Sequence, residues 1–221
     1  MSPIDEPRKR VGNPSQKLQK KSRKWIYIAL VLIVIAIAVV AFVLLQNLPS
    51  NNNGSSITKN PVAVIATSMG TIKVELYTDK MPITTANFIK LVNDGFYSGL
   101  VFHRVIDNFM IQGGGFYPNG TQKQDPYGTI NLETSPDVLH VDGAISMARL
   151  STPVDSATSQ FFICDGAQTS LDGQYAAFGK VIDGMDVVRA IASVTTTTKY
   201  TSYQNWPVTD VVINSITIAS S

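Results

Sequence analysis

The sequence predicts a mainly β domain over residues 61–221, built as an antiparallel barrel or sandwich, with one transmembrane helix before it. Roughly eight short apolar runs of strand length lie in this part of the chain. Two stretches between them have the apolar spacing of a helix, and the strands and helices do not alternate as they do in parallel sheets. An uncharged apolar run over residues 25–45 predicts the transmembrane helix.

The apolar run begins with Trp25 and contains twenty-one residues without a charge. As a helix it would rise about 1.5 Å per residue and span roughly 30 Å, the thickness of a hydrocarbon core. Eight Lys or Arg residues precede it, and no positive charge follows it before Lys59. The positive-inside rule therefore predicts a cytoplasmic N-terminus and a domain outside the membrane. A cleaved signal peptide is the alternative, but the run is too long and lacks a small-residue cleavage site at its end.

The chain thus divides into four predicted parts: a basic cytoplasmic tail at 1–24, the membrane anchor at 25–45, a flexible linker at 46–60 and the folded domain at 61–221. The linker is predicted to be flexible because its residues, rich in Asn, Ser and Gly, cannot bury apolar area. Residues 61–221 carry nine Lys or Arg against fourteen Asp or Glu. Since phosphate binding requires a positive face, we expect no nucleic-acid partner.

Periodicity and turn residues place the elements of the domain. Ile72, Val74 and Leu76 alternate with polar residues, which is typical of a half-buried strand. Pro82 suits the first turn of a helix. Strands are predicted at 62–68, 71–77, 101–105, 109–112, 144–148, 160–164, 177–182 and 211–218, helices at 82–94 and 185–194, and a low-complexity loop at 195–203.

Residues that could activate a nucleophile or hold a metal are scarce. The histidines are His103 and His140, and the only cysteine is Cys164. The chain contains no H-E-x-x-H, no Cys/His cluster and no G-x-S-x-G motif, and the glycines at 113–115 lack the frame of a phosphate-binding loop. We therefore expect no metal and no cofactor, and either binding or catalysis by the environment of the site alone.

Three stretches carry the functional signal: FHRVIDNFMIQGG at 102–114, SQFFIC at 159–164 and LDGQYAAFGKV at 171–181. Residues two apart in a strand point to the same face. Met110 is therefore expected to share a face with Gln112, and Gln160 with Phe162. Composition alone would assign the apolar residues of these stretches to the core and Arg104 to the solvated surface.

These stretches resemble the signature of the cyclophilin family of peptidyl-prolyl cis/trans isomerases, and the resemblance extends over residues 61–218. It implies a closed eight-stranded antiparallel barrel capped by two helices, which acts as a monomer on proline-containing polypeptides without a cofactor or covalent intermediate. By position, Arg104 matches the catalytic arginine of the family, and Gln112 matches the residue that binds the substrate backbone beside it. The positions that match the substrate groove are Phe109, Met110, Ala148, Gln160, Phe162, Leu171 and Tyr175.

The chain departs from the family pattern at three places. Ser170 stands where animal members often have the tryptophan that matters for cyclosporin binding, and Tyr175 stands where many members have a histidine. Arg149 and Leu150 replace a smaller polar pair, which resembles bacterial members and should change the preference for residues before the proline. Two alternatives to an isomerase stay open: a tethered module that binds proline-containing segments without turnover, and a hydrolase built on one of the histidines.

Overall fold

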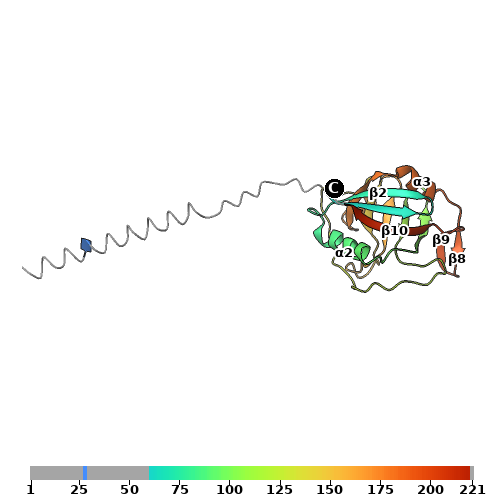
Figure 1. Cartoon of the computed structure of the whole chain (residues 1–221), viewed down its shortest axis with the longest axis horizontal. Coiled ribbons are helices and arrows are strands. Elements are labelled where there is room, and N and C mark those ends of the chain that lie inside the picture. The colour runs from blue at the N-terminus through green and yellow to red at the C-terminus, as the bar shows by residue number, and fades with distance from the viewer. Residues whose placement is uncertain (1–26, 29–59, 220–221) are drawn as a thin grey trace, which may run out of the picture. The chain divides into compact units, whose positions relative to one another are not determined.

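The computed structural model describes residues 27–28 and 60–219 (Figure 1). The predicted tail, anchor and linker lie outside the described residues, apart from Tyr27 and Ile28 within the anchor and Asn60 at the end of the linker. No helix in the two described ranges is long and apolar enough to cross a membrane. The division of residues 1–60 into three parts therefore stays a prediction.

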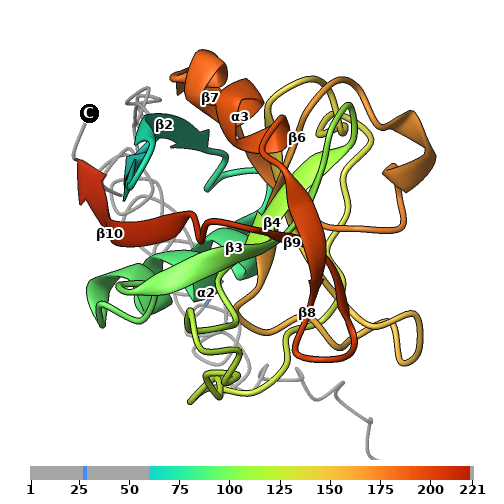
Figure 2. The same ribbon diagram turned by 90° about the vertical axis from the view of Figure 1, so that its right-hand side faces the viewer.

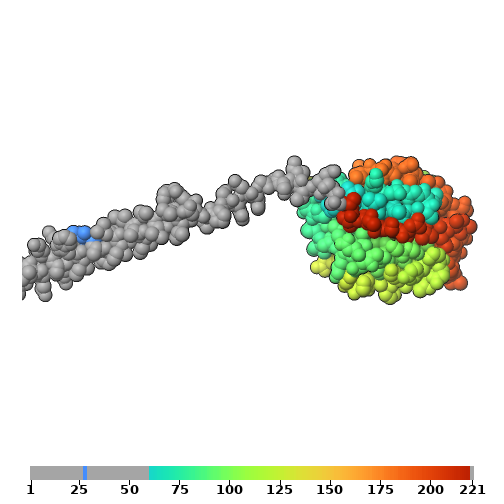
Figure 3. All heavy atoms as spheres, viewed as in Figure 1, coloured from blue at the N-terminus to red at the C-terminus, as the bar shows by residue number. Residues whose placement is uncertain are grey.

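Eight strands close into a barrel in which each strand pairs antiparallel with both of its neighbours. The order around the barrel is β1–β10–β3–β4–β6–β5–β7–β2, so the first and last strands of the domain lie side by side (Figure 3). Closure confirms the eight-stranded barrel that the resemblance implies, where the strand pattern alone left barrel and sandwich open. It also removes free sheet edges. The strands are β1 (Val62–Thr67), β2 (Gly70–Leu76), β3 (Leu100–Ile106), β4 (Met110–Gly113), β5 (Ala144–Met147), β6 (Phe161–Cys164), β7 (Ala177–Asp183) and β10 (Val212–Ala219).

Side chains alternate between the core and the surface along these strands, because successive residues of a strand point to opposite faces. In β2, Ile72, Val74 and Leu76 are fully buried, while Lys73 lies outside and pairs with Asp183 at 3.0 Å. The predicted alternation is confirmed. Each predicted barrel strand begins and ends within one residue of the observed strand.

Two helices pack against the barrel on opposite sides, as Figure 2 shows: α2 (Pro82–Asn93) and α3 (Met185–Ala192). Phe88 of α2 is fully buried. Its ring centroid lies between 5.2 and 5.6 Å from those of Tyr97, Phe161 and Phe178, in tilted and edge-on arrangements. Such arrangements are the favourable ones for aromatic rings, so α2 joins the barrel through an aromatic cluster in the core.

The loop predicted at 195–203 is wrong, because this stretch forms most of a hairpin of β8 (Thr196–Lys199) and β9 (Tyr203–Pro207). Trp206 of β9 is fully buried, and its Nε1 donates to Asp210 Oδ1 at 2.8 Å; Lys199 pairs with the same oxygen. The run of threonines has no apolar alternation, so its pattern did not predict a strand. β-branched residues nevertheless suit strands, and the burial of Trp206, outside the run, holds the hairpin in place.

His103 of β3 packs beneath this hairpin and is 6% exposed. Its ring centroid lies 4.6 Å from that of Phe116 and 5.9 Å from that of Trp206. Its Nδ1 has no hydrogen-bond partner in the described part of the chain. Burial lowers the pKa of His103 from its usual 6.5 to about 4. The imidazole is therefore neutral at neutral pH and serves the packing of the domain.

Replacing Trp206 with alanine should lower the free energy of unfolding by about 3–5 kcal/mol, because it removes a fully buried aromatic ring. Urea unfolding of the purified chain, followed by circular dichroism, measures the change. Val208→Ala is the matched control, since Val208 follows the hairpin and is 53% exposed. A loss below about 1 kcal/mol for Trp206→Ala would show that the hairpin lies outside the cooperative core.

Stability should fall as the pH drops from 6.5 to about 4, because His103 takes up a proton in the unfolded chain and stays neutral in the folded chain across this window. The difference in pKa corresponds to about 3 kcal/mol at the acid end. His103→Gln cannot titrate and should lose this part of the pH dependence. Chemical unfolding of the wild-type chain and of His103→Gln, measured between pH 6.5 and about 4, tests this prediction. If the free energy of unfolding of the two chains changes with pH in the same way, the lowered pKa of His103 is contradicted.

Candidate functional site

A row of outward side chains crosses four neighbouring strands. Arg104 on β3 stands opposite Gln112 on β4, Gln112 stands opposite Phe162 on β6, and Phe162 stands opposite Ser146 on β5. Residues directly opposite each other in antiparallel strands share a face. One register therefore places the charged and amide groups on the outer face while the alternate positions fill the core. Those core residues are Val105, Ile111, Ile145 and Ile163.

Three residues of this row, Arg104, Gln112 and Phe162, line a hollow of about 130 Å³. Eight of the nine residues predicted for catalysis or substrate binding line it, together with Arg149. Gln160 is the exception, and it lines the adjoining hollow along with Gln112, Ala148 and Arg149. The structure thus brings the predicted residues together along one groove, and their individual roles stay predictions. The eight residues are Arg104, Phe109, Met110, Gln112, Ala148, Phe162, Leu171 and Tyr175.

Four apolar side chains form a cup at the centre of the hollow. Met110 and Phe162 are the most buried, at 2% and 5% exposure, whereas Phe109 and Leu171 are half-buried. The ring of Tyr175 meets that of Phe162 edge-on, with centroids 5.9 Å apart, and lines the hollow beside it. The tyrosine therefore extends the wall of the cup. A pocket of this kind, mostly apolar with a few placed polar groups, suits a small apolar ring.

Arg104 lies beside the cup and is held by its neighbours. Its Nη1 donates to Gln112 Oε1 at 3.5 Å and lies 4.0 Å from Met110 Sδ, while the guanidinium carbon lies 5.8 Å from the centre of the Phe109 ring. Gln112 in turn donates through Nε2 to Gln160 Oε1 at 3.0 Å. Burial lowers the pKa of Arg104, but a guanidinium stays protonated at neutral pH. The site therefore presents a fixed positive donor next to an apolar surface.

The glycines at 113–115 have a packing role in this arrangement. A Cβ added at Gly115 would lie 2.6 Å from the side-chain carbons of Gln160, closer than van der Waals contact allows. Only a residue without a side chain leaves Gln160 where it accepts from Gln112. This agrees with the absence of a phosphate-binding frame around these glycines.

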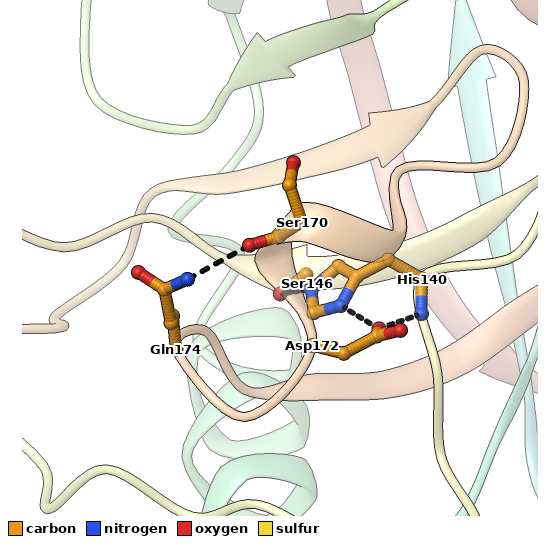
Figure 4. A network of polar contacts seen from close by, with 5 residues as sticks. All are labelled: His140, Ser146, Ser170, Asp172 and Gln174. Carbon is orange, nitrogen blue, oxygen red and sulfur yellow. Dashed lines mark hydrogen bonds and ion pairs between the residues drawn. The ribbon is translucent and has the colours of Figure 1, made fainter.

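A polar network lies behind the cup (Figure 4). His140 is 1% exposed; its Nδ1 lies 2.9 Å from Asp172 Oδ1 and its Nε2 lies 3.0 Å from Ser146 Oγ. Its ring is nearly parallel to that of Phe162, with centroids 6.0 Å apart. The order of groups is that of a Ser-His-Asp triad. Ser146 is fully buried, however, so no substrate carbonyl reaches its oxygen, and the network supports Phe162 instead of forming a hydrolase centre.

Arg149 also lines the hollow, although from sequence it stood out only as a departure from the family pattern. Its Nε donates to the carbonyl of Gln174 at 2.8 Å, and its Nη1 donates to the carbonyls of Leu150 at 2.7 Å and Ser151 at 3.2 Å. Its guanidinium carbon lies 4.9 Å from the centre of the Tyr175 ring. Arg149 thus ties the segment after β5 to the segment that carries Tyr175. Only the tertiary structure shows this bridge, because the two segments are distant in sequence.

The arrangement offers binding and electrostatic stabilisation, without an activated nucleophile in the described residues. Cys164 is fully buried, and burial raises the pKa of its thiol to about 12. No group of three or more His, Cys, Asp or Glu side chains within the described ranges is placed to hold a metal ion. What remains is an apolar cup with a charged donor beside it, suited to a reaction that breaks no bond.

Comparison with known proteins agrees with this chemistry. Residues 62–218 match the model of the family described as cyclophilin type peptidyl-prolyl cis-trans isomerase. The chain is 47% identical over 166 residues to a peptidyl-prolyl cis-trans isomerase of Acinetobacter baylyi, a match that covers 73% of this chain and 87% of the relative. It is 39% identical over 163 residues to peptidyl-prolyl cis-trans isomerase B of Escherichia coli, covering 69% of this chain and 96% of the relative.

Solved structures show the same fold. A cyclophilin type peptidyl-prolyl cis-trans isomerase of Cryptosporidium parvum, determined in the presence of the dipeptide Ala-Pro, superposes with a TM-score of 0.64 at 32% identity. The match covers 72% of this chain and 99% of that structure. Sequence, barrel and groove lead to the same conclusion: the chain belongs to the cyclophilin-type peptidyl-prolyl cis-trans isomerases, an enzyme family.

Proposed function

We propose that this cyclophilin works outside the cytoplasm, tethered to the membrane through residues 25–45, as a monomeric isomerase of bacterial type for proteins that fold there. The observation that carries the placement is the uncharged run of twenty-one residues with eight positive charges before it and none after it until Lys59. The polar linker at 46–60 would let the domain reach substrates near the membrane surface.

The isomerase reaction explains why the site has no nucleophile. Rotation about a peptide bond faces a barrier of about 18–20 kcal/mol that arises from C–N resonance, and no bond has to break. In the twisted transition state the proline nitrogen loses conjugation and becomes a hydrogen-bond acceptor. A donor aimed at this nitrogen therefore stabilises the transition state more than the ground state.

Arg104 is the proposed donor to the proline nitrogen. It is charged at neutral pH, it lies beside the cup, and Gln112 holds one of its nitrogens. Gln112 and Gln160, linked at 3.0 Å, would bind the backbone next to the proline. The cup would hold the proline ring while the preceding carbonyl turns, and Ala148 and Tyr175 would border it.

Replacing Arg104 with alanine should lower kcat/KM for an Ala-Pro peptide by about 100-fold, because one preorganised donor to the transition state is lost. Exchange NMR on the full chain measures the rate. Arg104→Lys should recover little of it, since an ammonium group lacks the fixed fork of donors.

Arg189→Ala is the matched control for this loss of charge. Arg189 lies on α3 and pairs with Asp142, away from the residues that line the hollow. Its replacement should leave the rate within about twofold, as for a surface substitution. A folded wild-type chain that binds the peptide without accelerating its isomerisation would favour the tethered binding module over the enzyme.

Protease added to intact cells should cut within residues 46–60 and release the domain, because the linker is predicted to be flexible and to lie outside the membrane. An antibody against the domain follows the fragment in the medium. A cytoplasmic marker protein that stays intact shows that the cells are closed. A domain that is cut only after lysis would contradict the proposed placement.

A further inference from the structure

The groove is positively charged although the domain is acidic. Two further hollows, of about 450 and 420 Å³, adjoin the cup. Arg149 lines both the 450 Å³ hollow and the hollow that contains the cup, and Arg104 lines both the 420 Å³ hollow and the hollow that contains the cup. No Asp or Glu side chain lines any of the three, whereas residues 61–221 carry fourteen acidic against nine basic residues. Two acids are adjacent in sequence to lining residues: Asp172 is bound by His140 behind the cup, and Asp155 accepts a hydrogen bond from the backbone N of Leu132 at 2.7 Å.

Local charge decides what the groove attracts. At physiological salt the Debye length is about 8 Å, so the acidic residues elsewhere on the domain are largely screened from a ligand in the groove. A charge placed in the groove itself interacts with the two arginines at short range and beside apolar walls, where screening is weaker. The charged side chains that an acidic group on a bound peptide meets along the lining are therefore both arginines.

Hydrogen bonds to the backbone fix the position of the Arg149 guanidinium. Three carbonyls, those of Leu150, Ser151 and Gln174, accept hydrogen bonds from Nε and Nη1 and hold the guanidinium beside the groove. Carbonyls are neutral, so the positive charge is not cancelled. No group in residues 60–219 accepts a hydrogen bond from Nη2, which leaves this nitrogen available to a ligand. Arg149 lines both the cup and the hollow beside it.

We propose that Arg149 is a specificity-determining residue that selects proline-containing segments with a Glu or Asp shortly before the proline. The carboxylate would lie in the hollow that Arg149 shares with Gln112, Ala148 and Gln160, and Nη2 would donate to it while the proline ring occupies the cup. The inference rests on the isomerase activity of the domain and is independent of where in the cell the domain lies.

A peptide series tests the preference. In each peptide Glu, Gln or Lys stands one, two or three residues before a single proline, and exchange NMR on the full chain, purified in mild detergent, measures kcat/KM. At one of these positions the Glu peptide should be isomerised about threefold faster than the Gln peptide, and the Lys peptide more slowly than either, as for a partly exposed charge pair. The ratio of Glu to Gln should shrink as NaCl is added.

Variants separate the charge of Arg149 from its support of Tyr175. In Arg149→Gln the loss of the bridge lowers the rate for all peptides together, but the ratio of Glu to Gln should fall to about one, because Arg149 and not Arg104 lines the hollow where the carboxylate would lie. Arg149→Lys should keep most of the ratio. Arg189→Gln removes the same charge from the domain at a position outside the groove and should leave the ratio unchanged.

A wild-type ratio of about one at all three positions, with the Gln peptide isomerised normally, would overturn the proposal, as would a ratio that survives in Arg149→Gln. If the wild-type chain does not accelerate isomerisation even of the Gln peptide, the proposed isomerase function is contradicted. Calorimetric affinities of the same peptides then decide the preference: tighter binding of the Glu peptide that disappears in Arg149→Gln supports it, and equal binding overturns it.

Discussion

The hydrogen-bonded register of β3, β4, β6 and β5 is the constraint on which the rest of the structure depends. In this register Arg104, Gln112, Phe162 and Ser146 follow one another across the outside of the barrel. A slip of one residue in any of these strands would turn its functional side chain into the core and an aliphatic one into the groove. Closure of the barrel opposes such a slip, because each strand is paired on both sides.

The two arginines of the groove are held in place by hydrogen bonds, and the acceptors differ between them. Arg104 is fixed by amide side chains, Gln112 and, through it, Gln160, whose place depends on the missing side chain of Gly115. Backbone carbonyls and the face of Tyr175 fix Arg149. Donors that need no reorganisation during a reaction stabilise a transition state most effectively. A domain of net negative charge thereby keeps a positive groove.

Two buried histidines lie next to the groove, and each is held by its neighbours. His140 lies behind Phe162, and both of its ring nitrogens have partners, in Asp172 and Ser146. His103 packs under the hairpin that Trp206 anchors, in the strand that carries Arg104. The two histidines are therefore structural parts of two separate supports. Aromatic rings surround His103, and a polar network holds His140.

The sequence by itself determined the secondary structure of the barrel to within a residue at each strand end, and it singled out the residues that line the groove. The strand ends rest on a local pattern, the period of two in strands, and the groove residues rest on the resemblance of three short motifs to the cyclophilin signature. Only the tertiary structure decided that the threonine run forms a hairpin and that Arg149 reaches Tyr175. These features depend on contacts between segments far apart in the chain, such as the burial of Trp206 against β3, and no local pattern carries such contacts.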